Sequence, residues 1–289
     1  MVKLAGDRFV WYLCLSHLIA DAQSFAIAYR YVASVYQKAD EAIPLPRFSD
    51  YVQFENDFVG SDGWKQCNEY WQSLIRQECG TAEFYGVPSE HGDGRIQRIK
   101  WPLGAVRSEH LRRIASTSEF SALTTQMSLS SIWTVLVSVF LHRVNGNQSQ
   151  RLALPFQARP TARFKETIGS FVEVGAIVVD FDELATFQSL HGQVLRRTID
   201  GLRYARPGTS SAEINRACPV RLNYVTAEFD SFAGFPVKTD WVHSGYGDAS
   251  QSLQIQVCDF DRTGEFVLYL DVAEHVFDDQ RQSWLIDQL

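Results

Sequence analysis

The first clear hydrophobic pattern is a continuous apolar run close to the start of the chain. Residues 9–15 are mostly apolar and β-prone, and they have the length and composition of a strand buried on both faces. Residues 24–37 follow with apolar side chains at spacings of three and four, which predicts a helix with one buried face. The loop between them carries His17, at a position where scaffolds commonly place reactive side chains.

Further along the chain, the same two periodicities predict most of the remaining elements. Helices are expected at residues 108–118, 130–144, 184–203 and 278–289. Strands are expected at residues 151–157, 171–181, 219–229, 253–259 and 265–272. Residues 76–100 are rich in glycine and charge and read as an exposed connection. Because strands and helices alternate without a strict βαβ rhythm or a glycine-rich phosphate loop, we expect an α/β layer sandwich with a mixed sheet.

The candidate chemistry lies just after the first apolar run. His17 follows this run, and Asp21 stands four residues later. An imidazole titrates near neutrality, so it can accept a proton from an attacking amine or alcohol and return it to a leaving thiol or alkoxide. The alternative is a histidine that only packs at the end of a strand. The His-x-x-x-Asp spacing alone does not separate these two interpretations.

The residues around His17 form a longer motif. Residues 16–22 read Ser-His-Leu-Ile-Ala-Asp-Ala. This segment resembles the His-His-x-x-x-Asp-Gly motif of nonribosomal peptide synthetase condensation domains. Ser16 stands in the place of the first His, His17 in that of the second, and Ala22 in that of the Gly.

Four other segments resemble motifs of the same family, in the same order and at similar separations. Residues 48–54 resemble an aromatic-x-Asp-Tyr-x-x-Trp segment, and residues 168–174 resemble Ile-Gly-x-Phe-Val-Asn-Thr, preceded by Arg159-Pro160. Residues 220–224 resemble a strand that ends in Asn-Tyr, and residues 264–270, followed by Phe277-Asp278, resemble the closing strand and helix. The resemblance therefore extends over nearly the whole chain.

The resemblance implies a fold and a division of the chain. The family has the mixed-sheet α/β layer sandwich of the chloramphenicol acetyltransferase type, built from two lobes. Only sixteen residues precede His17, whereas the family has over a hundred there, so the chain resembles the C-terminal part of such a domain. Residues 1–100 would hold the end of the first lobe with its active-site loop, helix and inter-lobe connection, and residues 101–289 the second lobe.

The resemblance also implies a reaction. An amine would attack a thioester on a phosphopantetheinyl arm, in a tunnel between the lobes, with His17 as base or positioning group. Asp21 would be structural and would pair with an arginine of the earlier lobe, which leaves Asp21 unpaired in this chain. Ser16 and Ala22 would belong to the same loop, and Ala22 would be strained if its position required a positive φ. The sequence identifies no substrate-binding residue.

The implied partners are proteins. Donor and acceptor carrier proteins would bring the phosphopantetheine, and no cofactor would bind this chain. An adenylation domain and a separately encoded first lobe are further candidate partners.

Two alternative functions stay open: a stand-alone acyltransferase that forms esters, and a truncated, non-catalytic docking module. Epimerisation uses a similar His motif, whereas heterocyclisation normally replaces the His by Asp, which His17 argues against.

Composition narrows the class of protein. A net charge of −7 without a long basic cluster argues against a nucleic-acid partner. The five cysteines form no C-x-x-C pair and the other six histidines form no ligand set, so no disulfide framework and no metal site are predicted. No apolar run approaches the roughly twenty residues that span a bilayer. Polar residues interrupt the weak resemblance of the N-terminus to a signal peptide, so we expect a cytoplasmic protein.

Overall fold

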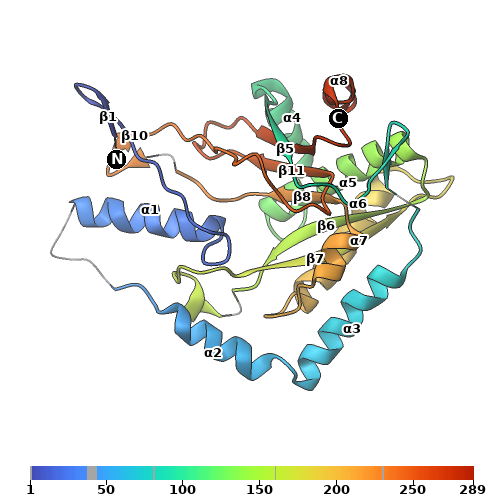
Figure 1. Ribbon diagram of the computed structural model, residues 1–289, viewed down its shortest axis with the longest axis horizontal. Helices are drawn as coiled ribbons and strands as arrows, with labels where there is room; N and C mark the ends of the chain where they lie inside the picture. The colour runs from blue at the N-terminus through green and yellow to red at the C-terminus, as the bar shows by residue number, and fades with distance from the viewer. Residues whose placement is uncertain (1, 38–43, 81, 160, 230) are drawn as a thin grey trace.

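A six-stranded mixed sheet forms the centre of the molecule in the computed structural model, which describes residues 2–37, 44–80, 82–159, 161–229 and 231–289 (Figure 1). In spatial order its strands are β5 (Ile96–Pro102), β12 (Val267–Ala273), β11 (Leu253–Cys258), β8 (Val220–Tyr224), β6 (Ser149–Gln157) and β7 (Val172–Asp180). β8 runs parallel to β11 and β6, and the other pairs are antiparallel. The predicted mixed α/β sheet is therefore confirmed.

One face of the sheet carries the main hydrophobic core. Along β11, Leu253, Ile255 and Val257 are fully buried in this core. Helix α5 (Thr125–Asn145) packs on β6 and β8, and α4 (Ala105–Ala115) and α6 (Phe187–Tyr204) pack on α5. α5 is long and apolar enough to cross a membrane by composition, but 61% of its most apolar window is buried inside the protein. This burial is typical of a core helix.

Helix α5 begins five residues before its predicted start. Thr124 is its N-cap, and the Thr124 hydroxyl accepts a hydrogen bond from the Met127 amide at 3.1 Å. The predicted helices at residues 108–118, 184–203 and 278–289 are confirmed as α4, α6 and α8 (Asp279–Gln288), with ends shifted by a few residues. The predicted strands are confirmed as β6, β7, β8, β11 and β12, and β8 ends five residues early.

The connection predicted over residues 76–100 is more ordered than expected. It contains the short hairpin β3 (Glu83–Phe84) and β4 (Val87–Pro88), and the Phe84 ring is fully buried in the main core. β5 then begins at Ile96 and pairs with β12 along its whole length. The expectation of a plain exposed connection is wrong, because apolar positions within this polar stretch anchor it to the core. Residue 100, the predicted end of the first part, lies within β5.

Two helices beside the β7 edge are tied to the sheet by one arginine. Helix α3 (Asp62–Arg76) follows α2 (Phe48–Phe58), and α7 (Ala212–Ala217) precedes β8. The Arg151 guanidinium on β6 donates to the carbonyl oxygens of Gln77 and Ala217, which are at the C-terminal ends of α3 and α7. A cation is favourable at the partly negative end of a helix, so Arg151 stabilises both ends at once.

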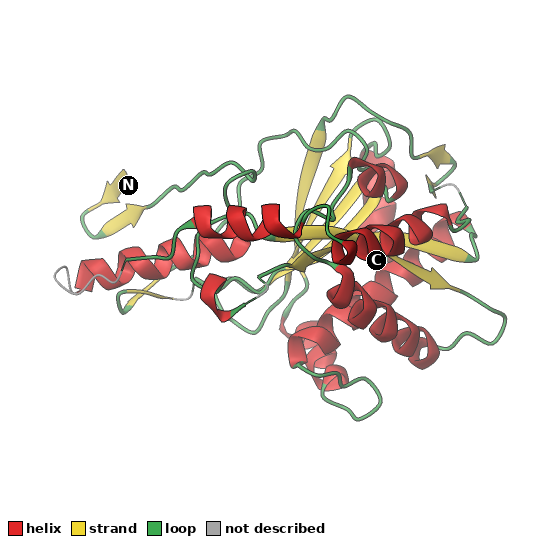
Figure 2. Ribbon diagram, turned by 90° about the horizontal axis from the view of Figure 1, so that it is seen from below, coloured by secondary structure: helices red, strands yellow, loops and turns green. Residues whose placement is uncertain are grey.

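The N-terminal segment differs most from expectation. β1 (Val2–Ala5) and β2 (Arg8–Val10) form a separate hairpin, and the chain has no regular secondary structure from Trp11 to Ser16. The strand predicted at residues 9–15 is therefore wrong beyond Val10. The following helix is confirmed as α1 (Ala22–Gln37). Figures 1 and 2 both show the hairpin at the outer end of the molecule, beside α1.

Helix α1 lies against the second, more polar side of the sheet. Ala26 of α1 is buried in a small apolar cluster with Val225, Ala227, Cys258 and Tyr269. A short hairpin formed by β9 (Ser231–Phe232) and β10 (Phe235–Pro236) packs on the outer part of α1. There the Phe232 ring contacts Tyr29 and Tyr36, with ring centroids 5.6 Å apart in each pair. These contacts fix α1 across the ends of the sheet strands.

Candidate functional site

His17 lies on an exposed turn directly before α1, as predicted. The turn is closed by the Ile19 amide, which donates to the Ser16 carbonyl oxygen at 3.0 Å. The Leu18 amide lies 3.3 Å from the Ser16 hydroxyl, which accepts a hydrogen bond from it. In the part of the chain that the structure describes, no hydrogen bond to the His17 ring is recorded. The imidazole is therefore available to a group that arrives from outside.

Asp21, four residues later, is buried and strongly bonded. Its carboxylate is 1% exposed and caps α1, because Oδ1 accepts from the Ser24 amide at 2.8 Å. The Arg159 guanidinium donates to both carboxylate oxygens, at 2.9 and 3.1 Å. The Phe171 amide donates to Oδ2 at 3.2 Å. The expectation that Asp21 is unpaired in this chain is wrong, because its arginine partner lies 138 residues further along the same chain.

Arg159 is itself held from several sides. Its Nη1 donates to the carbonyl oxygens of Phe164 and Thr167, at 3.0 and 2.7 Å. The guanidinium lies over the Phe171 ring, 4.0 Å from its centroid. Burial lowers the pKa of Arg159 from its ordinary value, and the neighbouring Asp21 carboxylate opposes this effect. An arginine stays charged under these conditions, so Arg159 and Asp21 form a buried ion pair. Pro160, which follows Arg159 in the predicted motif, lies outside the described residues.

Ser24 connects α1 to the segment before β7. The Ser24 hydroxyl oxygen lies 2.7 Å from both Asp21 Oδ1 and the Gly169 carbonyl oxygen, and it accepts from the Gly169 amide at 3.0 Å. A side chain at Gly169 would collide with the Phe48 ring, whose nearest atom is 2.0 Å from an ideal Cβ. Motif segments around residues 16–22, 48–54 and 168–174 therefore meet at one place.

An aromatic cluster supports this meeting point. The Tyr51 and Phe171 rings lie closest, tilted by 49° with centroids 4.2 Å apart, and Phe48 and Phe164 pack against them. Burial raises the pKa of Tyr51 far above its ordinary value, and the neighbouring Glu55 carboxylate adds to this effect. Tyr51 is therefore neutral and serves as packing beneath the His17 loop.

The two departures from the family motif have structural explanations. Ala22 is the first residue of α1 and is not among the described non-glycine residues with a positive φ. The expected backbone strain at Ala22 is therefore absent. Ser16, in place of a histidine, is exposed and closes the turn through its carbonyl oxygen and its hydroxyl.

Sequence reasoning missed the role of Glu173. This residue is 7% exposed, and its carboxylate accepts the backbone amides of Gly208, Thr209 and Ser210 at 2.8, 3.1 and 2.6 Å. Three consecutive amides that converge on one carboxylate form a concave anion site, which here is filled from within the chain. The available signal was a single acidic residue in an otherwise apolar strand. Burial raises the pKa of the nearby Glu55, and the negative charge of Glu173 raises it further.

Asn223 lies on the polar face of the sheet. Its side-chain amide donates to Gln256 Oε1 at 2.9 Å across the β8–β11 pair. The resemblance to condensation domains predicts that the His17 ring faces a cleft shared with residues 171–174 or with the Asn223 strand. The structure brings Asp21 and Ser24 against Gly169 and Phe171, and the direction of the His17 ring stays a prediction.

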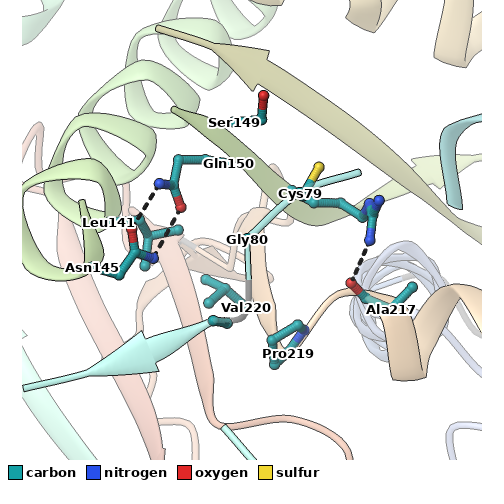
Figure 3. Close-up of a pocket in the computed structure, with 11 residues that line it drawn as sticks. Cys79, Gly80, Leu141, Asn145, Ser149, Gln150, Ala217, Pro219 and Val220 are labelled. Atoms are coloured by element: carbon teal, nitrogen blue, oxygen red, sulfur yellow. Dashed lines mark hydrogen bonds between the residues drawn. The ribbon is translucent and has the colours of Figure 1, made fainter. Parts of the chain in front are cut away.

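The two pockets described in the structure lie away from His17. The smaller, of about 40 Å³, is lined by Cys79, Gln150 and Arg151 among others (Figure 3). The larger, an open groove of about 680 Å³, lies between α3 and the loop before α7. Among the described residues no group of three or more His, Cys, Asp or Glu side chains is placed to hold a metal ion. All five cysteines are free thiols, and three of them are buried.

Comparison with known proteins gives consistent results. A family model described as Condensation domain matches residues 1–208. Gramicidin S synthase 2 of Aneurinibacillus migulanus is 24% identical over 181 residues, which cover 61% of this chain and 4% of that protein. Surfactin synthase subunit 1 of Bacillus subtilis (strain 168) is 23% identical over 186 residues, or 61% of this chain and 5% of that protein. The matched part is thus a small fraction of each of these relatives.

Solved structures show the same fold. The first condensation domain of the CDA synthetase matches with a TM-score of 0.76 and 16% identity, covering 94% of this chain and 60% of that one. The epimerization domain from the third module of tyrocidine synthetase B matches with a TM-score of 0.71 and 16% identity, covering 94% and 65%. The predicted α/β layer sandwich of the chloramphenicol acetyltransferase type is confirmed. The chain spans about three fifths of these structures.

Proposed function

Because this chain belongs to the condensation-domain family, we propose that it carries the His-bearing part of an acyl-transfer site of the condensation type. The product would be an amide between an acyl or aminoacyl thioester and an amine, both bound to carrier proteins. The observation that supports this proposal is the anchoring of the His17 loop. Asp21 is fixed by its ion pair with Arg159, by its cap of α1, and by Ser24, which connects α1 to Gly169. The exposed His17 imidazole lies four residues before this fixed carboxylate.

In the proposed reaction, the amine nitrogen attacks the thioester carbonyl carbon. A C–N bond forms, the C–S bond breaks, and the sulfur leaves as the thiol of the carrier arm. His17 takes the proton that the amine loses and returns a proton to the departing sulfur, or it orients the amine. An α-amine has a pKa close to 8, so part of it is already neutral, and orientation of the two substrates supplies much of the acceleration.

Asp21 and Arg159 act as positioning residues in this proposal. Both are nearly inaccessible to solvent, with side-chain exposures of 1% and 6%, so neither is placed to touch a substrate. Ser16 and Ala22 complete the active-site loop. The phosphopantetheine that delivers each substrate belongs to the carrier proteins.

The proposed partners follow from the same family. They are a donor and an acceptor carrier protein and an adenylation domain. We also propose a cytoplasmic location and a division into residues 1–100, with the active-site loop and connection, and residues 101–289, with the second lobe. The position of residue 100 within β5 means that one strand of the sheet crosses this boundary.

A second candidate function is a non-catalytic docking module. The observation that favours it is Ser16, because the family motif has its first histidine at this place, and here the serine hydroxyl accepts a hydrogen bond from the Leu18 amide within the turn. A docking module would keep the anchored loop but would not depend on the imidazole.

The experiment that separates these functions is a comparison of two histidine variants. In a protein that contains this chain within a complete condensation fold, His17→Ala should reduce amide formation between carrier-bound substrates by about a hundredfold or more, the range for losing a positioned acid or base. His110→Ala is the matched control, because His110 is an exposed histidine on α4. Unchanged turnover in His17→Ala would refute the catalytic role and support the docking module.

A further inference from the structure

The open groove between α3 and α7 has one wall with a regular row of side chains. Trp64, Asn68, Gln72 and Arg76 line it from α3 at spacings of four residues, so they lie on one face of the helix. At a rise of about 1.5 Å per residue, this row extends over about 18 Å from Trp64 to Arg76. That length matches five to six residues of an extended peptide, at about 3.3 Å for each residue.

The opposite wall of the groove comes from α7 and the loop before it. α3 and α7 lie side by side (Figure 1), and Ser210, Ser211 and Arg216 line the groove from the α7 side. The loop is held from behind, because the Glu173 carboxylate on β7 accepts the backbone amides of residues 208–210. The serine hydroxyls therefore have a fixed support.

Two hydrogen bonds between the walls keep them at a constant separation. The Trp64 indole N–H donates to the Gly208 carbonyl oxygen at 2.9 Å, and the Gln72 side-chain amide donates to the Glu213 carboxylate at 2.6 Å. The groove, of about 680 Å³, is thus formed before any ligand arrives. A pre-formed site reduces the ordering that binding requires.

Two arginines stand at one end of the groove. Arg76 is in the last turn of α3 and Arg216 in the last turn of α7. The Arg151 guanidinium donates to the carbonyl oxygens of the next residues, Gln77 and Ala217, so the two helix ends lie together. Arg76 and Arg216 are both exposed, and among the described residues no hydrogen bond or ion pair is recorded for either side chain. Both guanidinium groups are therefore available to a ligand.

The charge of the groove is opposite in sign to that of the whole chain. Its charged lining residues are Arg76, Arg216 and Glu213, which sum to +1, whereas the chain carries −7. A guanidinium binds a carboxylate through two parallel hydrogen bonds, so arginines of this kind select acidic groups. The negative charge elsewhere on the chain repels an acidic partner and favours its approach to this end of the groove.

We propose that this groove binds an extended acidic segment of a partner polypeptide, with its carboxylates on Arg76 and Arg216. The Asn68 and Gln72 amides are one turn apart on α3, about 6 Å, which is close to the roughly 6.6 Å between alternate residues of an extended chain. They hydrogen-bond to peptide groups of the segment from one side, and the hydroxyls of the opposite wall do so from the other. An apolar side chain of the segment packs on the half-buried Trp64 ring at the far end.

The first test is selection from a random hexapeptide library displayed on phage, with the purified full chain as bait. Selected peptides should carry Asp or Glu at one end and an aromatic or aliphatic residue at the other. The double variant Arg76→Gln/Arg216→Gln should lose the acidic preference. The proposal is wrong if the wild-type chain enriches no peptides, if it enriches peptides without acidic residues, or if the double variant selects the same acidic sequences.

The second test measures affinity for the most enriched peptide, labelled with fluorescein, by fluorescence polarisation. Arg76→Gln and Arg216→Gln should each weaken binding about tenfold, because each removes a charge-assisted hydrogen bond. Glu213→Gln removes a negative charge from the groove and should tighten binding, by roughly threefold. Arg107→Gln is the matched control, since Arg107 is an exposed arginine on α4 outside the groove, and it should bind like wild type. Equal loss in Arg107→Gln and in the groove variants would show that the peptide binds by non-specific charge.

The third test locates the peptide. The chain has seven tryptophans, whose indole N–H signals can be followed by NMR, and Trp64→Phe assigns the signal of Trp64. This signal should shift most when the selected peptide is added, and a larger shift at another tryptophan would overturn the assignment to the groove. None of these measurements uses acyl transfer. A chain that binds the peptide but does not transfer an acyl group in the complete fold would refute the proposed function and leave the groove as a peptide site.

Discussion

Removal of the Arg159 side chain should destabilise the fold more than the loss of any ion pair at the surface. In Arg159→Met the Asp21 carboxylate stays 1% exposed, and it loses two charge-assisted hydrogen bonds of 2.9 and 3.1 Å. Breaking a buried pair by removing one partner costs about 3–5 kcal/mol, because it leaves an uncompensated buried charge. At about 2 °C per kcal/mol for a chain of this size, the melting temperature should fall by roughly 6–10 °C.

The control for this prediction is another arginine–aspartate pair of the same chain. Arg163 donates to Asp50 at 2.6 Å, but their side chains are 63% and 45% exposed. An exposed pair of this kind contributes about 0–1 kcal/mol, so Arg163→Met should shift the melting temperature by roughly 2 °C or less. Thermal unfolding by circular dichroism and urea unfolding would measure both variants.

A double-mutant cycle completes the assay. Asp21→Asn combined with Arg159→Met removes both charges, so the double variant should be more stable than the sum of the single effects predicts, by at least 1 kcal/mol. If Arg159→Met costs no more than Arg163→Met, the ion pair does not hold the loop. If the two single effects simply add, the charges of Asp21 and Arg159 are not coupled.

Two further predictions concern the surroundings of the site. Glu55→Gln should stabilise the fold at pH 7, because burial and Glu173 raise the pKa of Glu55 and folding therefore favours its neutral form. This gain should shrink as the pH falls through the raised pKa of Glu55 and should be lost below the ordinary glutamate pKa, and a gain that does not depend on pH would contradict the reasoning. Gly169→Ala should cost about 1–3 kcal/mol in urea unfolding, because the new methyl group overlaps the Phe48 ring, whereas Gly6→Ala meets no atom within 4 Å and should have little effect.

Each helix that the sequence predicted is present, whereas one predicted strand, at residues 9–15, is absent beyond Val10, and this difference has a physical reason. A helix makes its backbone hydrogen bonds within its own segment, so α1 and α8 follow from local periodicity. A strand requires a neighbour, and the apolar pattern of residues 9–15 contains no information on whether that neighbour is present. β5 was missed because its alternating polar residues lie within a charged stretch that resembles a loop.

In the candidate site too, the sequence predicts contacts between neighbouring residues better than contacts between residues far apart in the chain. The turn at His17 and the cap at Asp21 both form within a few residues of sequence, and the motif located the turn. The partner of Asp21 could not be identified by spacing, because 138 residues separate it from Arg159. The role of Glu173 depends on three backbone amides of a distant loop. Because nearly every residue has a backbone amide, the amino-acid sequence does not show which amides bind a given carboxylate.

The anchoring of Asp21 has a mechanical consequence for the chain on either side of it. Asp21, Arg159 and Gly169 tie the start of α1 to the segment before β7, so a displacement of the sheet edge carries the helix with it. On the other side, no backbone–backbone hydrogen bond within the described residues involves residues 11–15. A force applied to the N-terminal hairpin therefore reaches His17 before it reaches Asp21. The histidine therefore lies between a support made of an ion pair and hydrogen bonds on one side and a segment held by side-chain packing, such as that of Trp11 on Tyr29, on the other.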